Sequence, residues 1–323
     1  MSLPNPVDYA VPAFVTLVLV EMIIVHRAHR ARYEPKDTLT SLSMGLGSTI
    51  AGALTAVAIL AMSGFLNAHR LWDIPYAWWA WIACFVLDDF NYYVFHRTAH
   101  RVRWFWAAHV NHHSSQHYNL STALRQTWTG FFSLGFVFRL WPLLLGFPIP
   151  MLLFCGGINL IYQFWIHTEV IGRCPRWFEA MMNTPSHHRV HHAVNPRYLD
   201  RNYAGVFIVW DKLFGTFENE RDDEQIRYGI VKQLGTFNLL WSVFHEWAGI
   251  GRDLWSAPWR AKLKYVVGPP GWSHDGSRET SDMIRNRWER KSWTNSTSLS
   301  SAADRVEALP QGASAKEAST ASA

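Results

Sequence analysis

Histidine is the residue whose number and spacing in this sequence suggest chemistry. The chain has 323 residues and 16 histidines, and eleven of these lie between positions 96 and 192. Within that stretch are an HxxxH motif, two HxxHH motifs and a single histidine between the second and third motifs: His96 and His100; His109, His112 and His113; His188, His191 and His192; and His167. Residues three or four apart project from one face of a helix, so each motif presents its imidazoles together.

Nine imidazoles are more than one metal ion takes, since an ion binds about four to six ligands. Nine ligands are a suitable number for two ions. Imidazole is a ligand of iron, zinc, copper and nickel, whereas structural zinc sites usually include cysteine, which these motifs lack. We therefore predict a dinuclear metal site with nine ligands: His96, His100, His109, His112, His113, His167, His188, His191 and His192.

Acidic residues near the motifs are candidates for supporting roles. Asp89 precedes His96 by seven residues and His100 by eleven, which places all three near one face of a helix. We predict that Asp89 is a catalytic-site residue that orients an imidazole, with direct ligation as the second choice. Asp88 points away and is expected to make a packing or loop contact. Glu169 is a weaker candidate, and its alternative is an ordinary interfacial acid.

The remaining histidines divide into two sets. His117 follows His113 by four and could support a ligand, and His187 precedes His191 by four and could replace His188 as a ligand. Both roles stay open. Five others are expected to be ordinary core or surface histidines: His26, His29, His69, His245 and His274.

Long apolar runs must position these motifs. Hydrophobic residues make up 49% of the chain, and there are 18 tryptophans, a residue that favours membrane interfaces. The runs cover residues 9–25, 44–66, 76–95, 128–145 and 149–166. Each is near the ~20 residues that cross a bilayer. The last two are expected to form a hairpin that turns at Pro148 and Pro150, either transmembrane or re-entrant.

The charges around these runs predict a topology. A basic cluster at residues 26–32 follows the first run, whereas a signal peptide has its basic residues before the apolar run. The positive-inside rule then places the cluster in the cytoplasm, and counting the later runs brings every histidine motif to the cytoplasmic face. We predict an all-α, multi-pass integral membrane protein with about four to five transmembrane or re-entrant helices and a cytosolic, histidine-rich helical lobe.

Other features limit the alternatives. The net charge of +5 comes from basic residues that flank apolar runs, so no nucleic-acid partner is expected. Three separated cysteines indicate neither a disulfide framework nor a CxxC site. The expected units are a membrane domain (1–250), a basic and aromatic extension (251–294) and a Ser- and Ala-rich disordered tail (295–323). Residues 203–210 are expected as a short strand or buried loop, 211–217 as a turn, and 238–247 as an amphipathic or interfacial helix.

The motifs HRTAH, HVNHHSS and SHHRVHH, followed by WDKLFGTF, resemble the fatty acid hydroxylase/sterol desaturase superfamily. The stretches QFWIHTEVIG and NTPSHHRVHHAVNPRYLDRNYAG are most similar to its alkylglycerol monooxygenase branch. The resemblance implies a membrane-embedded helical protein whose cytosolic lobe holds two non-haem iron ions, with the nine histidines as ligands.

The resemblance also implies an O₂-dependent monooxygenase that hydroxylates a C–H bond of a membrane lipid, such as an ether lipid, a sterol or an acyl chain. Desaturation by the same superfamily is the alternative. The electron donor is expected to be external: tetrahydrobiopterin, cytochrome b5 or a ferredoxin-type protein. Two other classes are a histidine-rich membrane metal transporter and a zinc hydrolase, although the HExxH motif of many zinc hydrolases is absent.

Overall fold

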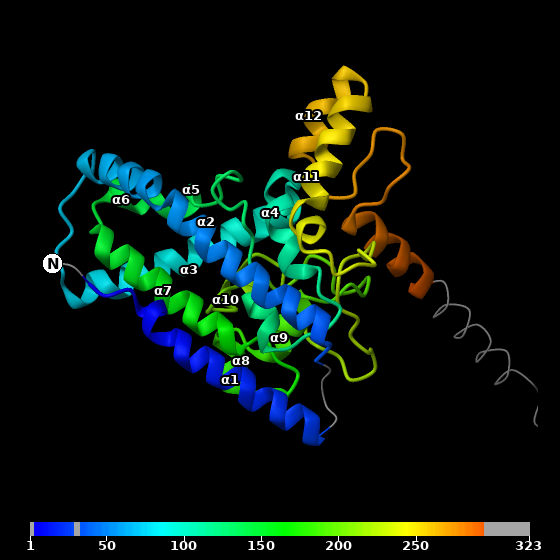
Figure 1. The fold of residues 1–323 in the computed structure, drawn as a ribbon, viewed down its shortest axis with the longest axis horizontal. Helices are drawn as coiled ribbons and strands as arrows, with labels where there is room; N and C mark the ends of the chain where they lie inside the picture. Colours follow the sequence, from blue (N-terminus) through cyan, green and yellow to red (C-terminus); the bar gives the residue numbers. More distant parts are fainter. Residues whose placement is uncertain (1–2, 29–32, 294–323) are drawn as a thin grey trace, which may run out of the picture.

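The computed structural model describes residues 3–28 and 33–293, and these residues form an all-α fold. Four long helices lie lengthwise beside one another (Figure 1): α1 (Pro6–Ala28), α2 (Pro35–Ala68), α3 (Trp78–Arg101) and α7 (Ile149–Trp165). No strand occurs in the described ranges, where only two isolated β-bridges form. The predicted all-α class is confirmed. The predicted disordered tail lies outside the described residues.

Shorter helices form a lobe at one end of this bundle (Figure 1). They are α4 (Arg103–His113), η1 (Leu120–Leu124), α8 (Arg176–Met181), α9 (Pro185–His191), α10 (Val209–Leu213), α11 (Leu239–Ser256) and α12 (Trp259–Val267). A further helix covers residues 281–293. Of the segment 203–210, residues 203–206 lie in a buried loop, which was one of the two predicted alternatives. Helix α10 occupies the end of that segment and the start of the predicted turn at 211–217, so the prediction is wrong there. Helix α11 extends well beyond the predicted helix at 238–247.

Two of the described helices, α1 and α2, are long and apolar enough to cross a membrane. Only 6% of the residues in the apolar window of α2 are buried, so this helix is not the core of a water-soluble domain. Leu54 and Val57, for example, present their side chains outward. Such surfaces are stable in lipid, which supports membrane insertion at the first two predicted runs. Most of the third run lies in the more polar α3, which begins two residues later than the run, and α7 has 17 residues.

The predicted fourth span at 128–145 is wrong as a continuous helix. Residues 130–136 are turns, and two one-turn helices follow, α5 (Val137–Leu140) and α6 (Pro142–Leu145). Leu134 has a positive φ of 61°, which no helix tolerates, and Pro142 has no N–H to donate to a preceding carbonyl. The predicted turn is confirmed, since Gly146 caps α6 in the left-handed region and Pro148 is the N-cap of α7.

An apolar cluster joins α3, α5, α6 and α7. Cys84 of α3 and Cys155 of α7 both lie in it as free, buried thiols. The cluster fixes α3 against α7, and α3 leads directly into the lobe.

An ion pair crosses this cluster. Both carboxylate oxygens of Asp88 lie 2.9 Å from Nη2 of Arg139, and Asp88 is only 1% exposed. Gly156 on α7 permits this arrangement, because a Cβ there would lie 2.7 Å from the guanidinium. The pair explains how α5 carries an arginine within an apolar run, and it makes Asp88 the packing contact that was predicted.

We expect Arg139→Met to destabilise the protein by about 3 kcal/mol, because it leaves a buried carboxylate without its counter-charge. The double variant Asp88→Leu/Arg139→Met should recover most of that loss, since no unpaired charge remains. Thermal unfolding of the detergent-solubilised protein measures both. Asp88→Leu is the second single variant. If the destabilisation of the double variant equals the sum of the destabilisations of the two single variants, Asp88 and Arg139 do not act as a pair.

Candidate metal centre

The histidine motifs come from helix ends that meet in the lobe. His96 and His100 lie on the last turns of α3, and the chain then bends at Val102, which has extended dihedral angles, into α4. Helix α9 brings the third motif opposite α4. Five imidazoles, hereafter the five-histidine group, have ligand atoms within 4.8 Å of one another: His96, His100, His109, His113 and His191.

The other four predicted ligands form a second cluster, the four-histidine group, which meets the same criterion: His112, His167, His188 and His192. Each HxxHH motif therefore divides between the two groups. The first and last histidines of the motif, four residues apart, share one group, and the middle histidine joins the other. All nine predicted ligands are thus brought together, in two adjoining sets.

The nitrogen atoms within each group are spaced as ligands of a shared ion would be. Six Nε2–Nε2 distances fall between 2.9 and 3.2 Å: His96–His109, His109–His113, His113–His191, His112–His167, His167–His188 and His188–His192. Two nitrogens bound at about 2.1 Å and at right angles on one ion would be about 3 Å apart. Both groups therefore fit a metal ion.

Backbone carbonyls determine which nitrogen is free. Nδ1 of His96 lies 2.7 Å from the carbonyl oxygen of Tyr203, Nδ1 of His167 lies 2.7 Å from that of Gln163, and Nδ1 of His191 lies 3.0 Å from that of Arg201. A carbonyl only accepts, so each Nδ1 carries the proton and donates it. In the neutral ring Nε2 is then a bare lone pair directed into the group, as metal binding requires.

Burial keeps most of these rings neutral. Desolvation lowers the pKa of His109, His112, His113, His188, His191 and His192 well below the ordinary histidine value, and neighbouring imidazoles lower it further. Nε2 of His100 is buried with no hydrogen-bond partner. A neutral imidazole is the form that binds metal, so the donor set suits a soft or borderline divalent cation such as ferrous iron.

These lowered pKa values predict acid sensitivity of the metal-free protein. As pH falls below about 6.5, the unfolded chain takes up protons on these histidines while the folded state does not, so stability decreases. We expect the unfolding midpoint of chelator-treated protein to be lower at about pH 5.5 than at about pH 7.5. A midpoint that is unchanged or higher in acid would show that the imidazoles are not held neutral.

A strained loop supplies two of the three carbonyls. Asp200 and Asn202 have positive φ angles of 56° and 55°, which are uncommon for residues other than glycine. The Asn202 side chain holds this conformation: its amide donates to the carbonyls of His187 and Glu218, and its oxygen accepts from the backbone N–H of Glu218. The carbonyls of Arg201 and Tyr203 are thereby directed at His191 and His96.

Two buried carboxylates hold the rest of the loop. Asp211 accepts from the backbone N–H groups of Tyr203 and Ala204, each at 2.8 Å, and burial raises its pKa to about 6. Asp89 accepts from the backbone N–H groups of Val206 and Phe207, at 2.7 and 3.0 Å.

Asp89 also accepts from the indole N–H of Trp210 at 2.9 Å and from the amide of Asn159 at 3.1 Å. Gly205 permits this close approach, because a Cβ there would lie 2.9 Å from Asp89. No described imidazole hydrogen-bonds to Asp89. Asp89 therefore does not contact His96 directly, contrary to the prediction. It acts on His96 indirectly, by holding the loop whose Tyr203 carbonyl accepts a hydrogen bond from His96.

The two histidines whose roles were open lie outside both groups. The ring of His187 contacts Phe217 edge-on, and the described hydrogen bonds of His117 involve only its backbone N–H and carbonyl groups. Sequence spacing did not reveal the carbonyl partners, because any residue provides a carbonyl. The closest sequence signal for these carbonyls was the Asn202-Tyr203 pair, which lies in one of the stretches that resemble the alkylglycerol monooxygenase branch.

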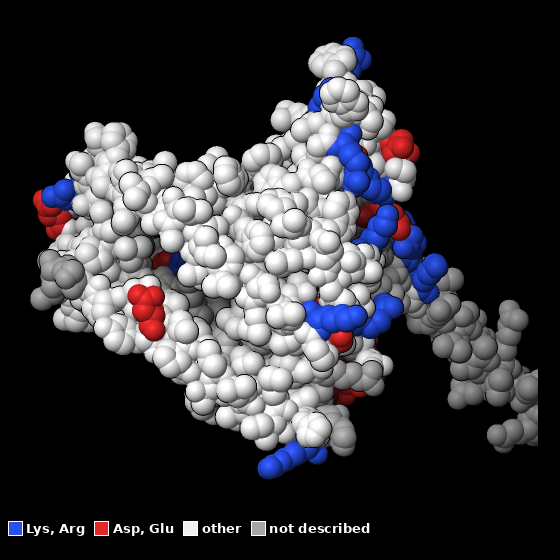
Figure 2. Space-filling view, in the orientation of Figure 1, with Lys and Arg blue, Asp and Glu red and all other residues white. Residues whose placement is uncertain are grey.

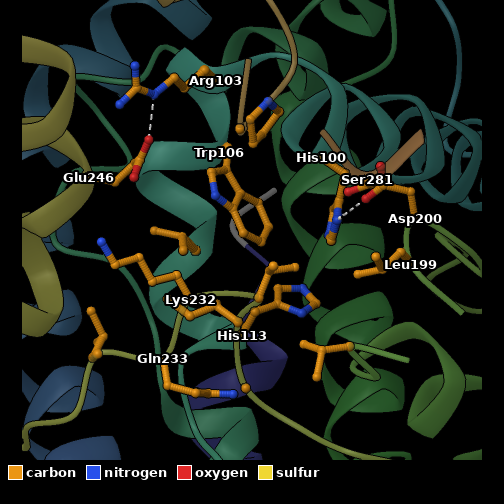
Figure 3. Close-up of a pocket in the computed structure, with 18 of the residues that line it drawn as sticks. His100, Arg103, Trp106, His113, Leu199, Asp200, Lys232, Gln233, Glu246 and Ser281 are labelled. Atoms are coloured by element: carbon orange, nitrogen blue, oxygen red, sulfur yellow. Dashed lines mark hydrogen bonds and ion pairs between the residues drawn. The ribbon is translucent and has the colours of Figure 1, made fainter. Parts of the chain in front are cut away.

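A cavity of about 640 Å³ reaches the histidine groups (Figure 3). His100, His113, His191 and His192 form part of its wall, together with the aromatic ring of Trp106. Its far wall includes residues of α11 and the 229–234 segment. A molecule in this cavity could therefore place an atom beside both groups.

Comparison with known proteins identifies this region. Residues 81–216, which contain all nine histidines, match the family model named fatty acid hydroxylase. The predicted resemblance is confirmed.

Longer alignments extend the similarity beyond this domain. The chain is 39% identical to human alkylglycerol monooxygenase over 277 residues, covering 84% of this chain and 61% of that protein. It is 40% identical to the Xenopus tropicalis alkylglycerol monooxygenase, covering 84% and 60%. It is 30% identical to an ornithine lipid hydroxylase of Rhizobium tropici over 155 residues, covering 45% and 44%. The chain thus spans about three-fifths of the first two relatives, and no solved structure gives a significant match.

Proposed function

We propose that this protein is an O₂-dependent lipid hydroxylase whose two histidine groups each hold one iron ion. The convergence of nine imidazoles into two sets, most of them held neutral by burial and three with Nε2 directed inward, carries this proposal. The named relatives, which include alkylglycerol monooxygenases and a lipid hydroxylase, support a lipid as substrate. Because the alkylglycerol enzymes align with most of the chain, an ether-linked glycerolipid is the first substrate to test.

The reaction balances only with an external reductant. One C–H bond becomes C–OH, one oxygen atom of O₂ leaves as water, and two electrons and two protons are consumed. Bound iron would activate O₂, the oxidant, toward an unactivated C–H bond. If the oxidised carbon bears an ether oxygen, the hemiacetal product breaks down to an aldehyde and an alcohol.

The chain's own residues orient the imidazoles and shape the substrate's surroundings. The carbonyls of Tyr203, Gln163 and Arg201 fix the ring orientations, so the ligand set is organised before substrate arrives. The cavity beside His100 and His113 is partly aromatic and would hold the substrate carbon next to the groups while limiting water.

Membrane placement gives the substrate a route. We propose that α1 and α2 span the bilayer, with α3 and α7 as further spans, and that the lobe lies at the cytoplasmic face. A site at that height accepts lipid without extracting it fully into water. The reductant, a pterin or an electron-transfer protein, would approach from the cytoplasm.

The direct test uses the purified full chain in lipid vesicles with iron, O₂ and each reductant in turn. An alkylglycerol and its ester-linked counterpart serve as matched substrates, and mass spectrometry follows aldehyde release and addition of one oxygen. We expect iron-dependent oxidation with ¹⁸O₂ incorporated into product. Zinc-dependent hydrolysis, or metal transport without lipid oxidation, would contradict the proposal.

A further inference from the structure

Helices α11 and α12 form a hairpin outside the matched family domain. The hairpin turns at Ala257 and Pro258 and projects from α4, crosswise to α1 and α2 (Figure 1). Helix α11 contacts both α4 and α2, so the hairpin begins beside the bundle. Its position places it near the level at which the apolar helices enter the lobe.

One face of the hairpin is apolar and uncovered. On α11 the exposed positions follow helical spacing and end at a tryptophan that is 91% exposed: Leu240, Phe244, Ala248, Gly251 and Trp255. The stripe continues on α12 at four-residue intervals: Trp259, Leu263 and Val267. Trp259 is 76% exposed and Leu263 is 71% exposed. Such a stripe is unfavourable in water and requires an apolar partner.

The opposite face of α11 is fixed to the lobe by ion pairs. Arg103, at the start of α4, donates to Glu246 and to Asp253, each at 2.5 Å. These are the two acidic residues of α11 and α12. Both acids therefore face inward, and the same helix α4 carries His109, His112 and His113 of the metal centre.

The outer surface is left with positive charge. Helices α11 and α12 carry four further basic residues, Arg252, Arg260, Lys262 and Lys264, and the Lys264 ammonium lies 4.6 Å from the ring centroid of Trp272. Among the described residues none of them forms an ion pair. Figure 2 shows Lys and Arg gathered along this side while most of the bundle surface carries no charge. The Arg260 guanidinium lies 5.3 Å from the Trp259 ring centroid, so cation and indole alternate on one surface.

This combination of tryptophan, aliphatic and basic side chains suits a bilayer interface. Indole rings favour the headgroup level, and Lys and Arg are attracted to anionic lipid. Protein interfaces, by contrast, are depleted in lysine. An amphipathic helix with a basic flank lies in the plane of the interface, which is the crosswise orientation that α11 and α12 adopt.

We propose that the α11–α12 hairpin docks on the headgroup layer of an anionic lipid leaflet, next to the spanning helices. The inference rests on the membrane placement given under the proposed function. Through Arg103 the docked hairpin positions α4, and it sets the height of the cavity wall formed by Trp241 and Gly249 relative to the lipid.

A fluorescent probe tests the depth of the hairpin without requiring turnover or iron. Trp259→Cys is labelled with an environment-sensitive dye in the full chain, on a Cys174→Ser background because Cys84 and Cys155 are buried. Asp222→Cys, on an exposed loop, is the matched control. The protein is placed in phosphatidylcholine vesicles with and without phosphatidylglycerol, and quenching by nitroxides near the headgroup, at mid-chain, and by aqueous iodide is compared.

We expect headgroup nitroxide to quench the probe at position 259 roughly two-fold or more over the control, with iodide less effective. Phosphatidylglycerol should increase that quenching, and Arg260→Glu/Lys264→Glu should cancel the increase. Iodide quenching equal to the control would overturn the proposal. Protection of the probe from every quencher would also overturn it and would indicate a protein partner or a second copy. Stronger quenching by the mid-chain nitroxide than by the headgroup nitroxide would overturn it as well. None of these results depends on lipid oxidation, so the proposed function is tested separately.

Discussion

Replacement of His112 by alanine is expected to remove one of the two iron ions and to lower turnover by about 100-fold or more. His112 is the α4 member of the four-histidine group, and its Nε2 lies 3.1 Å from Nε2 of His167. Without it, three imidazoles remain in that group, while the five-histidine group keeps all its members. Elemental analysis of the purified variant and ¹⁸O₂ incorporation measure the two effects.

His69→Ala is the matched control, because this exposed histidine lies at the end of α2 and belongs to neither group. It should keep both irons and full turnover. The ligand assignment fails if His112→Ala retains two irons and wild-type turnover. Loss of both ions from His112→Ala would instead show that the two groups do not bind independently.

Asp89→Asn is expected to cost about 2–6 kcal/mol of stability and most of the activity. The carboxylate accepts two hydrogen bonds on each oxygen, from Asn159 and Val206 on one and from Phe207 and Trp210 on the other. Asparagine replaces one of these oxygens by an NH₂ group. In either orientation of the side chain, that NH₂ group faces two N–H donors and can accept from neither. Each unsatisfied group costs about 1–3 kcal/mol, and the loop that holds the Tyr203 carbonyl is released.

Thermal unfolding measures the first effect of Asp89→Asn. Iron content and X-ray absorption, measured well below the unfolding midpoint, separate positioning of His96 from general instability. Asp222→Asn, at an exposed position, should change neither stability nor iron content. An Asp89→Asn protein with normal stability and a normal iron spectrum would mean that Asp89 does not support the centre.

The sequence was most informative about the ligands, because helical spacing alone determines which side chains share a face. The HxxxH motif, the two HxxHH motifs and His167 together predicted nine converging imidazoles, and the structure brings all nine together. The division of each motif between two groups was not predicted, because residues three apart and four apart both lie on one helix face and spacing alone does not assign them to different ions.

Contacts between residues far apart in the chain could not be predicted from the sequence. The break in the fourth run follows from a left-handed residue, Leu134, and from an arginine that pairs with Asp88, 51 positions earlier in the chain. Likewise, the carbonyls of Arg201 and Tyr203 act through the strained backbone around Asn202. Apolar content and periodicity describe one element at a time, so neither property predicts contacts between elements.

Iron stoichiometry and ligand type test the central claim most directly. The purified full chain, loaded anaerobically with ferrous iron, can be analysed for metal per chain and by iron K-edge X-ray absorption. We predict two tightly bound irons per chain, one for each histidine group, with a first shell of nitrogen and oxygen dominated by imidazole scattering and no sulfur. No tightly bound iron, one iron that persists at saturation, or a shell without imidazole would contradict a dinuclear centre built from these nine histidines.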